Sequence, residues 1–207
     1  HSTEKVSVVH NGIIENSDKL KKEYEKKGYK FKSQTDTEVI TIILTDYLKT
    51  ENLIDSIYKT LNKLIGSFAL GVIFKDFEDV VVGARRGSPL AVGYGHNENF
   101  LGSDSYALKT MTNKISYLDD GDFCLLYKEK IEFYNSDKKK INKKIFELSN
   151  EENIAEKGDY KDFMSKEIYE QNITAKTCIK EYVDHLRKEI NLYKFPINPE
   201  KIEKIVL

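Results

Sequence analysis

Residues 8–16 bring together residue types that could serve acyl-transfer chemistry. They read Val8-Val9-His10-Asn11-Gly12-Ile13-Ile14-Glu15-Asn16. An Asn side-chain amide and an adjacent Gly N–H can both point at one developing negative charge, and Gly permits the backbone angles that such an oxyanion hole needs. The alternative is a hairpin turn, because Asn-Gly is the strongest short turn signal. Local chemistry alone favours the turn for Asn11 and Gly12.

A second candidate is the acidic residue in Thr35-Asp36-Thr37-Glu38. A carboxylate at the start of a helix could be aimed at a substrate ammonium group. The helix dipole also favours an acid in the first turn without any function, and Thr35 and Glu38 have the spacing of a capping box. Taken alone, Asp36 is better explained as a structural residue.

Other reactive residue types lack the context that chemistry requires. The loop at residues 83–90 carries two arginines that could cradle an anion, but the G-x-S-x-G pattern of a nucleophile elbow is missing. The four histidines are scattered, without metal-ligand spacing, and His10 at a strand end is expected to be packed and hydrogen-bonded. Cys124 lies in an apolar run and Cys178 in a predicted helix without an activating base. We therefore predict neither a metal nor a cofactor.

Hydrophobic periodicity predicts the elements that must position these residues. A strand at 6–10 is followed by helices at 17–27, 35–48 and 52–64, with a short strand at 29–32. Continuous apolar runs after Gly66 predict strands covered on both faces. These strands are expected at 68–74, 80–84, 90–93, 99–103, 114–117, 123–127 and 131–134. A helical layer followed by closely spaced strands predicts an α+β layered fold.

Charge and hydropathy exclude several classes of partner. Lys and Arg number 33 against 34 Asp and Glu, which leaves a net charge of -1 and removes the main reason to expect nucleic acid or an anionic membrane. No apolar run approaches the roughly 20 residues that span a bilayer. We expect a cytoplasmic protein. A polar, Lys-rich stretch at 135–159 places a domain boundary near residue 150, followed by a helix at 163–190.

Taken together, the motifs resemble one family, the glucosamine-6-phosphate synthases, in sequence order. The resemblance extends to about Gln171. It rests on the stretches at residues 8–16, 35–40, 86–90, 99–104, 121–122 and 164–171, the last of which reads Met-Ser-Lys-Glu-Ile-Tyr-Glu-Gln. Amidophosphoribosyltransferases share the His-Asn-Gly and Thr-Asp elements but fit the other stretches less well.

The resemblance implies a class II glutamine amidotransferase domain with the N-terminal-nucleophile hydrolase fold, an αββα four-layer sandwich present here in part. In that family an N-terminal Cys thiol attacks the glutamine side-chain amide, and ammonia is released. The resemblance assigns the oxyanion hole to Asn11 and Gly12, and contact with the glutamine α-amino group to Asp36.

Two departures from the family shape the remaining expectations. The family's Met-Cys-Gly start is not in this sequence, so residues 1–150 correspond to the C-terminal part of the amidotransferase domain, and the chain alone is expected to be inactive. Residues 151–207 would be a linker and helical segment leading to a sugar-isomerase domain, absent here, that binds fructose 6-phosphate. The complete protein is expected to be a homo-oligomer. The alternatives are a non-catalytic remnant or binding module, or another class II enzyme such as an amidophosphoribosyltransferase.

Overall fold

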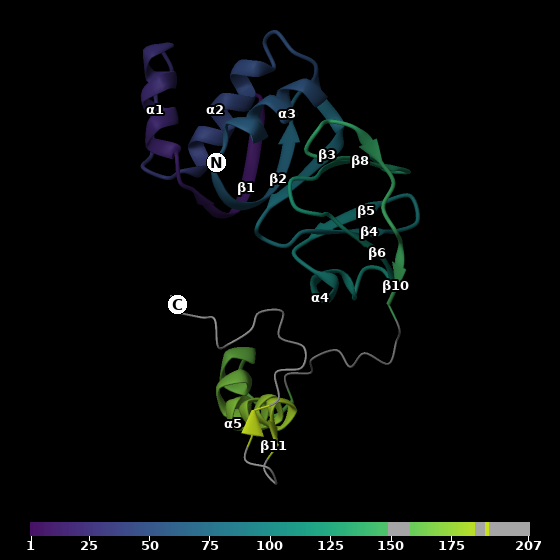
Figure 1. The fold of residues 1–207 in the computed structure, drawn as a ribbon. Coiled ribbons are helices and arrows are strands. Elements are labelled where there is room, and N and C mark those ends of the chain that lie inside the picture. The colour runs from purple at the N-terminus through teal and green to yellow at the C-terminus, as the bar shows by residue number, and fades with distance from the viewer. Residues whose placement is uncertain (149–157, 185–188, 191–207) are drawn as a thin grey trace. The chain divides into compact units, whose positions relative to one another are not determined.

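A six-stranded sheet organises the first of the two units into which the chain divides, His1–Glu152 and Asn153–Leu207 (Figure 1). The computed structural model describes residues 1–148, 158–184 and 189–190. The elements of the first unit are, in order, β1 (Val6–Ile14), α1 (Ser17–Lys26), α2 (Thr37–Tyr47), α3 (Leu53–Lys63), β2 (Gly66–Phe74), β3 (Phe77–Arg86), β4 (Ala91–Tyr94), β5 (Asn99–Gly102), α4 (Ser105–Leu108), β6 (Lys114–Tyr117), β7 (Phe123–Leu126), β8 (Ile131–Tyr134), β9 (Lys140–Ile141) and β10 (Phe146–Glu147).

Strand order places β1 at an edge of the large sheet. The large sheet runs β1-β2-β3-β7-β8-β9 and a smaller one runs β10-β6-β4-β5, with antiparallel neighbours throughout. β1 and β2 pair over their full length, from Val6 opposite Phe74 to Ile14 opposite Gly66. One side of the β1 backbone therefore faces β2. In the part of the chain that the structure describes, no further strand of this sheet lies on the other side, where residues 1–3 bond to the Val6–Val8 end of β1.

One face of the large sheet is covered by the helices α1, α2 and α3 (Figure 1). The period-2 alternation of a strand sends Val6, Val8 and Ile14 of β1 to this face, where each is at most 3% exposed. They join a core that includes Leu20, Tyr24, Val39, Ile40, Ile43, Ile57, Phe68, Leu70, Val72, Val82, Phe123 and Leu125. Full burial of one such aliphatic or aromatic side chain contributes about 1.5–3 kcal/mol, so this face supplies most of the driving force for folding.

The opposite face carries the small sheet, which covers it in part. Leu90, which precedes β4, and Val92 of β4 pack on the large sheet, and the short helix α4 packs on the far side of the small sheet through Leu108. By contrast, Val9 and Ile13 of β1 remain 73% and 67% exposed. Helices, a large sheet and a small sheet thus form consecutive layers, which confirms the predicted α+β arrangement.

Two predictions about the course of the backbone in this unit are wrong. The chain does not turn at Asn11-Gly12, because β1 continues to Ile14 with Asn11 opposite Ala69 and Gly12 opposite Phe68. Long-range pairing with β2 overrides the local turn signal. Residues 29–32, predicted as a strand, are irregular. The Tyr29 ring instead packs against the Tyr24 ring at an interplanar angle of 55°, and its hydroxyl donates to Asp46.

In the second unit, the structure describes one long helix. This helix is α5 (Phe163–Tyr182), and the short strands β11 (Val183–Asp184) and β12 (Glu189–Ile190) follow it. Asp162 caps α5 by accepting a hydrogen bond from the Ser165 N–H. The helix predicted to reach Ile190 therefore ends at Tyr182, where β11 begins to pair with β12. The predicted domain boundary near residue 150 lies outside the described residues. No helix in the part of the chain that the structure describes is long and apolar enough to cross a membrane.

Candidate functional site

The backbone of β1 directs alternate N–H groups to opposite sides. The Glu15 N–H bonds to the Ile65 carbonyl beside β2, whereas the Ile14 N–H points away from β2 and bonds to the Asp36 carboxylate at 2.7 Å. Because N–H direction alternates in an antiparallel pair, the Gly12 N–H lies on the same side as that of Ile14. Gly12 thus presents a donor along the edge of the sheet.

Only glycine fits at position 12. Its φ is +141°, a conformation that L side chains rarely adopt, and an added Cβ would lie 2.1 Å from the Ser67 carbonyl oxygen and 2.8 Å from the Phe68 Cα. These obstacles are backbone atoms of the paired strand, so they cannot rotate away. The residue that the sequence assigned to a turn is required instead by close strand pairing.

Asn11 and His10 lie on opposite faces of β1, as consecutive strand residues must. Asn11 is exposed and lines a cavity of about 260 Å³ that also involves Leu101 and Ser103 of the small-sheet region. The His10 imidazole turns towards the helices and is 2% exposed. The Asn11 side chain, which borders the cavity on one face of β1, and the Gly12 N–H, which lies along the strand edge, therefore belong to consecutive residues.

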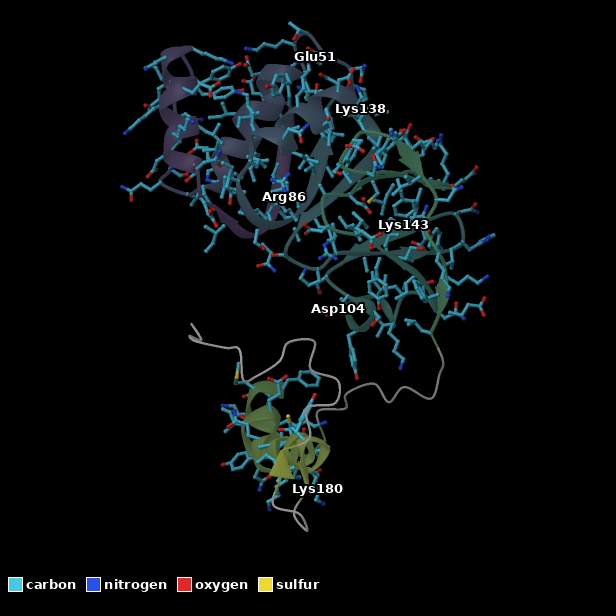
Figure 2. The ribbon with its side chains drawn as sticks, in the orientation of Figure 1. Glu51, Arg86, Asp104, Lys138, Lys143 and Lys180 are labelled. Carbon is cyan, nitrogen blue, oxygen red and sulfur yellow. The ribbon has the colours of Figure 1, made fainter. Side chains whose placement is uncertain are left out.

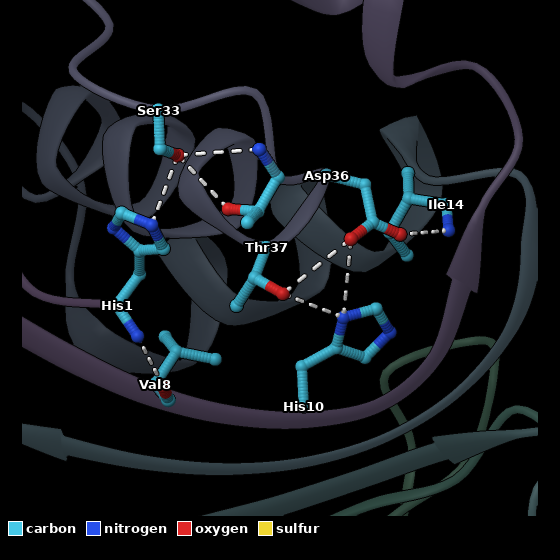
Figure 3. Close-up of polar contacts among 8 residues, drawn as sticks. His1, Val8, His10, Ile14, Ser33, Asp36 and Thr37 are labelled. Carbon is cyan, nitrogen blue, oxygen red and sulfur yellow. Dashed lines mark hydrogen bonds and ion pairs between the residues drawn. The ribbon is translucent and has the colours of Figure 1, made fainter.

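Asp36 is joined to β1 rather than to its own helix. It occupies the N-cap position of α2 but makes no side-chain capping bond. Its Oδ2 accepts the Ile14 N–H, and its Oδ1 lies 3.5 Å from the Thr37 hydroxyl and 3.9 Å from His10 Nδ1 (Figure 3). The carboxylate is 27% exposed. A carboxylate has about four acceptor positions, so capacity remains for a further donor.

His10 completes this arrangement from the face of β1 that packs on the helices (Figure 3). Its Nδ1 lies 3.0 Å from the Thr37 hydroxyl oxygen (Figure 3), and its Nε2 is buried with no hydrogen-bond partner. Burial lowers the pKa of His10 from its ordinary 6.5, and the nearby Asp36 opposes that shift only in part. A neutral ring that donates from Nδ1 leaves Nε2 as an unpaired acceptor, which avoids burying an unpaired N–H. The expectation of a packed, hydrogen-bonded His10 is confirmed.

A second carboxylate fixes the loop that precedes Asp36. Glu38 is 5% exposed and accepts hydrogen bonds from the Lys32 N–H, the Ser33 N–H and the Ser33 hydroxyl, each at 2.7 Å. The predicted capping box between Thr35 and Glu38 is therefore wrong, because these donors from the irregular segment satisfy Glu38 instead. Burial alone would raise the pKa of Glu38, but the hydrogen bonds lower it below 4.5.

The arginine loop supports the strands rather than cradling an anion. Arg86 (Figure 2) donates to the carbonyls of Leu64 and Leu61, at 2.6 and 3.3 Å, and its guanidinium lies 5.2 Å from the Phe68 ring centroid. Phe68 is the register partner of both Gly12 and Arg86. Arg86 therefore ties the end of α3 to the part of β2 that faces Gly12.

The remaining candidates have structural roles. Asp104 caps α4 by accepting a hydrogen bond from the Ala107 N–H at 2.9 Å. Cys124 is fully buried, and this raises the pKa of its thiol to about 12. Cys178 is exposed on α5. Within the described residues, no group of three or more His, Cys, Asp or Glu side chains could hold a metal ion.

Comparison with known proteins decides the family. A sequence profile described as glutamine amidotransferase domain matches residues 1–110. This chain belongs to the glutamine amidotransferase family. Two proteins named glutamine–fructose-6-phosphate aminotransferase (isomerizing) are similar to this chain: the one from Zymomonas mobilis is 38% identical to it, and one from Bradyrhizobium diazoefficiens is 39% identical to it. These matches cover 100% and 99% of this chain but 34% of each relative, so this amidotransferase chain spans about a third of their length.

Solved amidotransferase structures share the fold. The glutamine phosphoribosylpyrophosphate amidotransferase from B. subtilis, complexed with ADP and GMP, matches with a TM-score of 0.56 and 21% identity over 66% of this chain and 30% of that one. A structure described as the allosteric regulatory enzyme of purine biosynthesis matches with a TM-score of 0.54 and 22% identity over 66% of this chain and 30% of that one. At these identities the likeness shows the fold alone, and it confirms the predicted N-terminal-nucleophile hydrolase fold.

Sequence reasoning missed the links that join the candidate residues. Thr37 and the Ile14 N–H connect Asp36 to β1, although neither was singled out. A signal was present, because His10 directly precedes Asn11 and Thr37 directly follows Asp36. What could not be read from the sequence is that these two dipeptides meet.

Proposed function

We propose that this chain carries the oxyanion hole and the ammonium-binding carboxylate of a glutamine-hydrolysing site. In this proposal the complete protein is a glutamine–fructose-6-phosphate aminotransferase. Glutamine and water yield glutamate and ammonia, and the ammonia then aminates fructose 6-phosphate bound by a sugar-isomerase domain. A cytoplasmic location and a homo-oligomeric complete enzyme belong to the same proposal.

The geometry of the β1 edge is the observation that carries the proposal. Attack on an amide carbonyl moves negative charge onto its oxygen, and preorganised donors stabilise that charge most effectively. Gly12 supplies a backbone N–H on the edge, and Asn11 supplies an exposed side-chain amide next to it. Two donors on consecutive residues, of which Asn11 borders an open cavity of about 260 Å³, are the form that an oxyanion hole takes.

Asp36 lies at a suitable separation to hold the other end of glutamine. The N–H groups of Gly12 and Ile14 are two residues apart, or about 7 Å along a strand, and Asp36 sits at the Ile14 end. Four bonds join the amide carbon of glutamine to its ammonium nitrogen, so an extended side chain spans a similar length. Asp36 would accept the ammonium while the amide carbonyl meets Gly12.

The attacking group in this proposal is a cysteine thiol at the N-terminus of the complete protein, as in the family that the motifs resemble. Neither cysteine of this chain suits the task. Cys124 is fully buried with a pKa raised to about 12, and Cys178 lies on α5 in the other unit. A buried thiol that stays protonated is a poor nucleophile.

An amidophosphoribosyltransferase is the competing enzyme, since the solved structures with this fold include one. Identity favours the aminotransferase: relatives with that name are 36–39% identical along nearly the whole chain, against 21% over 66% of it for the B. subtilis structure. A non-catalytic remnant is the other alternative.

Glutamate release by the product of the complete gene tests the proposal. We expect glutamine hydrolysis coupled to fructose 6-phosphate amination, and a KM for glutamine raised at least about tenfold in Asp36→Asn through loss of the charge pair. The Asn side chain keeps an oxygen for the Ile14 N–H, so the fold is retained. Amination of phosphoribosyl pyrophosphate instead would identify the competing enzyme, and an absence of hydrolysis would favour the remnant.

A further inference from the structure

His10 and Thr37 form a polar connection behind the candidate site that the proposed chemistry does not itself use. His10 Nδ1 lies 3.0 Å from the Thr37 oxygen, and that oxygen lies 3.5 Å from Asp36 Oδ1. The ring comes from β1 and the hydroxyl from the first residue of α2. Two residues 27 positions apart along the chain thus join β1 to α2 at the carboxylate (Figure 3).

We propose that His10 and Thr37 are positioning residues that orient the Asp36 carboxylate towards the ammonium group of glutamine. This inference rests on the proposed function, because it assumes that Asp36 binds that group. The Ile14 N–H fixes Oδ2, and the hydroxyl of Thr37, itself fixed by His10, restrains Oδ1. Restraint at both oxygens sets the plane of the carboxylate before substrate arrives, which reduces the ordering cost of binding.

A direct hydrogen-bond relay explains the direction of each contact. His10 donates from Nδ1 to the Thr37 oxygen, and the Thr37 hydroxyl donates to Asp36 Oδ1. The buried Nε2 is then a lone-pair acceptor without a donor. This arrangement requires a neutral ring, because an imidazolium would bury a second N–H without a partner.

Protonation of His10 would change the site in a defined way. The charged group that faces its ring is Asp36 from α2, at 3.9 Å; its register partner on β2 is Leu70, and Glu38 is bonded to Lys32 and Ser33. An imidazolium would pair with Asp36 and compete with the substrate ammonium for the same carboxylate. Glutamine binding should therefore weaken in acid while the catalytic step changes little.

Thr37→Val in the complete protein is the most direct test, since valine keeps the shape and removes the hydroxyl. We expect KM for glutamine to rise about tenfold, equivalent to about 1.4 kcal/mol, with kcat changed less than about twofold, and Thr37→Ser to restore it. Thr41→Val is the matched control, because the buried Thr41 hydroxyl bonds only to the Glu38 carbonyl of its own helix. An unchanged KM in Thr37→Val, or an equal rise in Thr41→Val, would overturn the inference.

A second measurement on this chain needs no catalysis and separates the two proposals. Ring NMR should show His10 titrating below 6.5, and lower still in Asp36→Asn, because the carboxylate favours the protonated ring. A His10 pKa that Asp36→Asn leaves in place would overturn the positioning role, even if glutamine is hydrolysed. Conversely, a complete protein that does not hydrolyse glutamine would defeat the proposed function while this titration still reports the contact.

Discussion

The two faces of the large sheet are covered to different extents, and β1 shows the difference within neighbouring residues. Towards the helices, Ile14 is 1% exposed and the His10 ring 2% exposed, and His10 Nδ1 is hydrogen-bonded to Thr37 of α2. On the opposite face, Ile13 is 67% exposed and Asn11 borders an open cavity. The helix face holds the strand in place, and the other face and the open edge present the donors. Stability and chemistry should therefore be separable within one strand.

The largest difference in unfolding free energy is expected between alanine variants of two adjacent isoleucines. Ile14→Ala should lower the free energy of unfolding by about 2–5 kcal/mol, because it leaves a cavity in the core. Ile13→Ala, on the exposed face, should change it by no more than about 0.5 kcal/mol. Urea unfolding of both variants of this chain measures the difference. Equal losses would mean that the two faces are covered alike.

Gly12→Ala tests whether the edge donor depends on strand pairing. We expect a loss of roughly 2–4 kcal/mol in unfolding free energy, since the new methyl group meets backbone atoms of β2 and the positive φ adds strain. Hydrogen exchange should quicken at amides of β1 and β2 before it does in α3. A variant as stable as the parent chain would show that β1 does not pair with β2 in this register.

Glu38→Gln should lower the free energy of unfolding by less, about 1–2 kcal/mol. The amide retains one acceptor oxygen but lacks the negative charge to which three groups donate hydrogen bonds. The pKa of Glu38 is lowered in the folded state. The contribution of the Glu38 carboxylate to stability is therefore fully present above the pKa of Glu38 in the unfolded chain, near 4.5, and is lost as pH falls through its lower pKa in the folded chain. Unfolding measured between pH 7 and 3 should show an acid-dependent loss that is smaller in Glu38→Gln. Identical pH profiles would exclude this role.

The smallest effect is expected from His10. Its folded pKa lies below 6.5, so between the two values the unfolded chain binds more protons, and stability decreases as pH falls below 6.5. His10→Asn, which keeps a donor near the position of Nδ1, should remove this slope. Thermal unfolding at several pH values from 7 to 5 would detect it, and a slope that persists in the variant would assign it to another group.

The sequence predicts the elements better than it predicts their junctions. Helical periodicity identified α1, α2 and α3, and continuous apolar runs identified β2, β3 and β7, because burial imposes these patterns locally. The course of the chain at Asn11-Gly12 could not be predicted, since the partner that keeps it extended, Ser67–Ala69, lies more than fifty positions away. The partners of Glu38 escaped prediction for a related reason: they come from residues 32–33, which have no regular structure.

For the site, the residue types suggested the chemistry, but the resemblance to a family was needed to choose it. Local chemistry alone favours a turn at Asn11-Gly12 and a helix-terminal acid at Asp36. The structure shows that the two places meet, through the hydrogen bond from the Ile14 N–H to Asp36. That contact and the one between His10 and Thr37 join β1 to α2, and no local sequence pattern shows that the two elements meet.

Asn11→Ala in the product of the complete gene tests the central claim most directly, with kcat for glutamine hydrolysis and the free energy of unfolding measured on the same samples. Because Asn11 is exposed beside the cavity, we predict a fall in kcat of about 10²–10³-fold and a stability change within about 0.5 kcal/mol. An unchanged kcat would contradict the assignment of the β1 edge as the oxyanion hole.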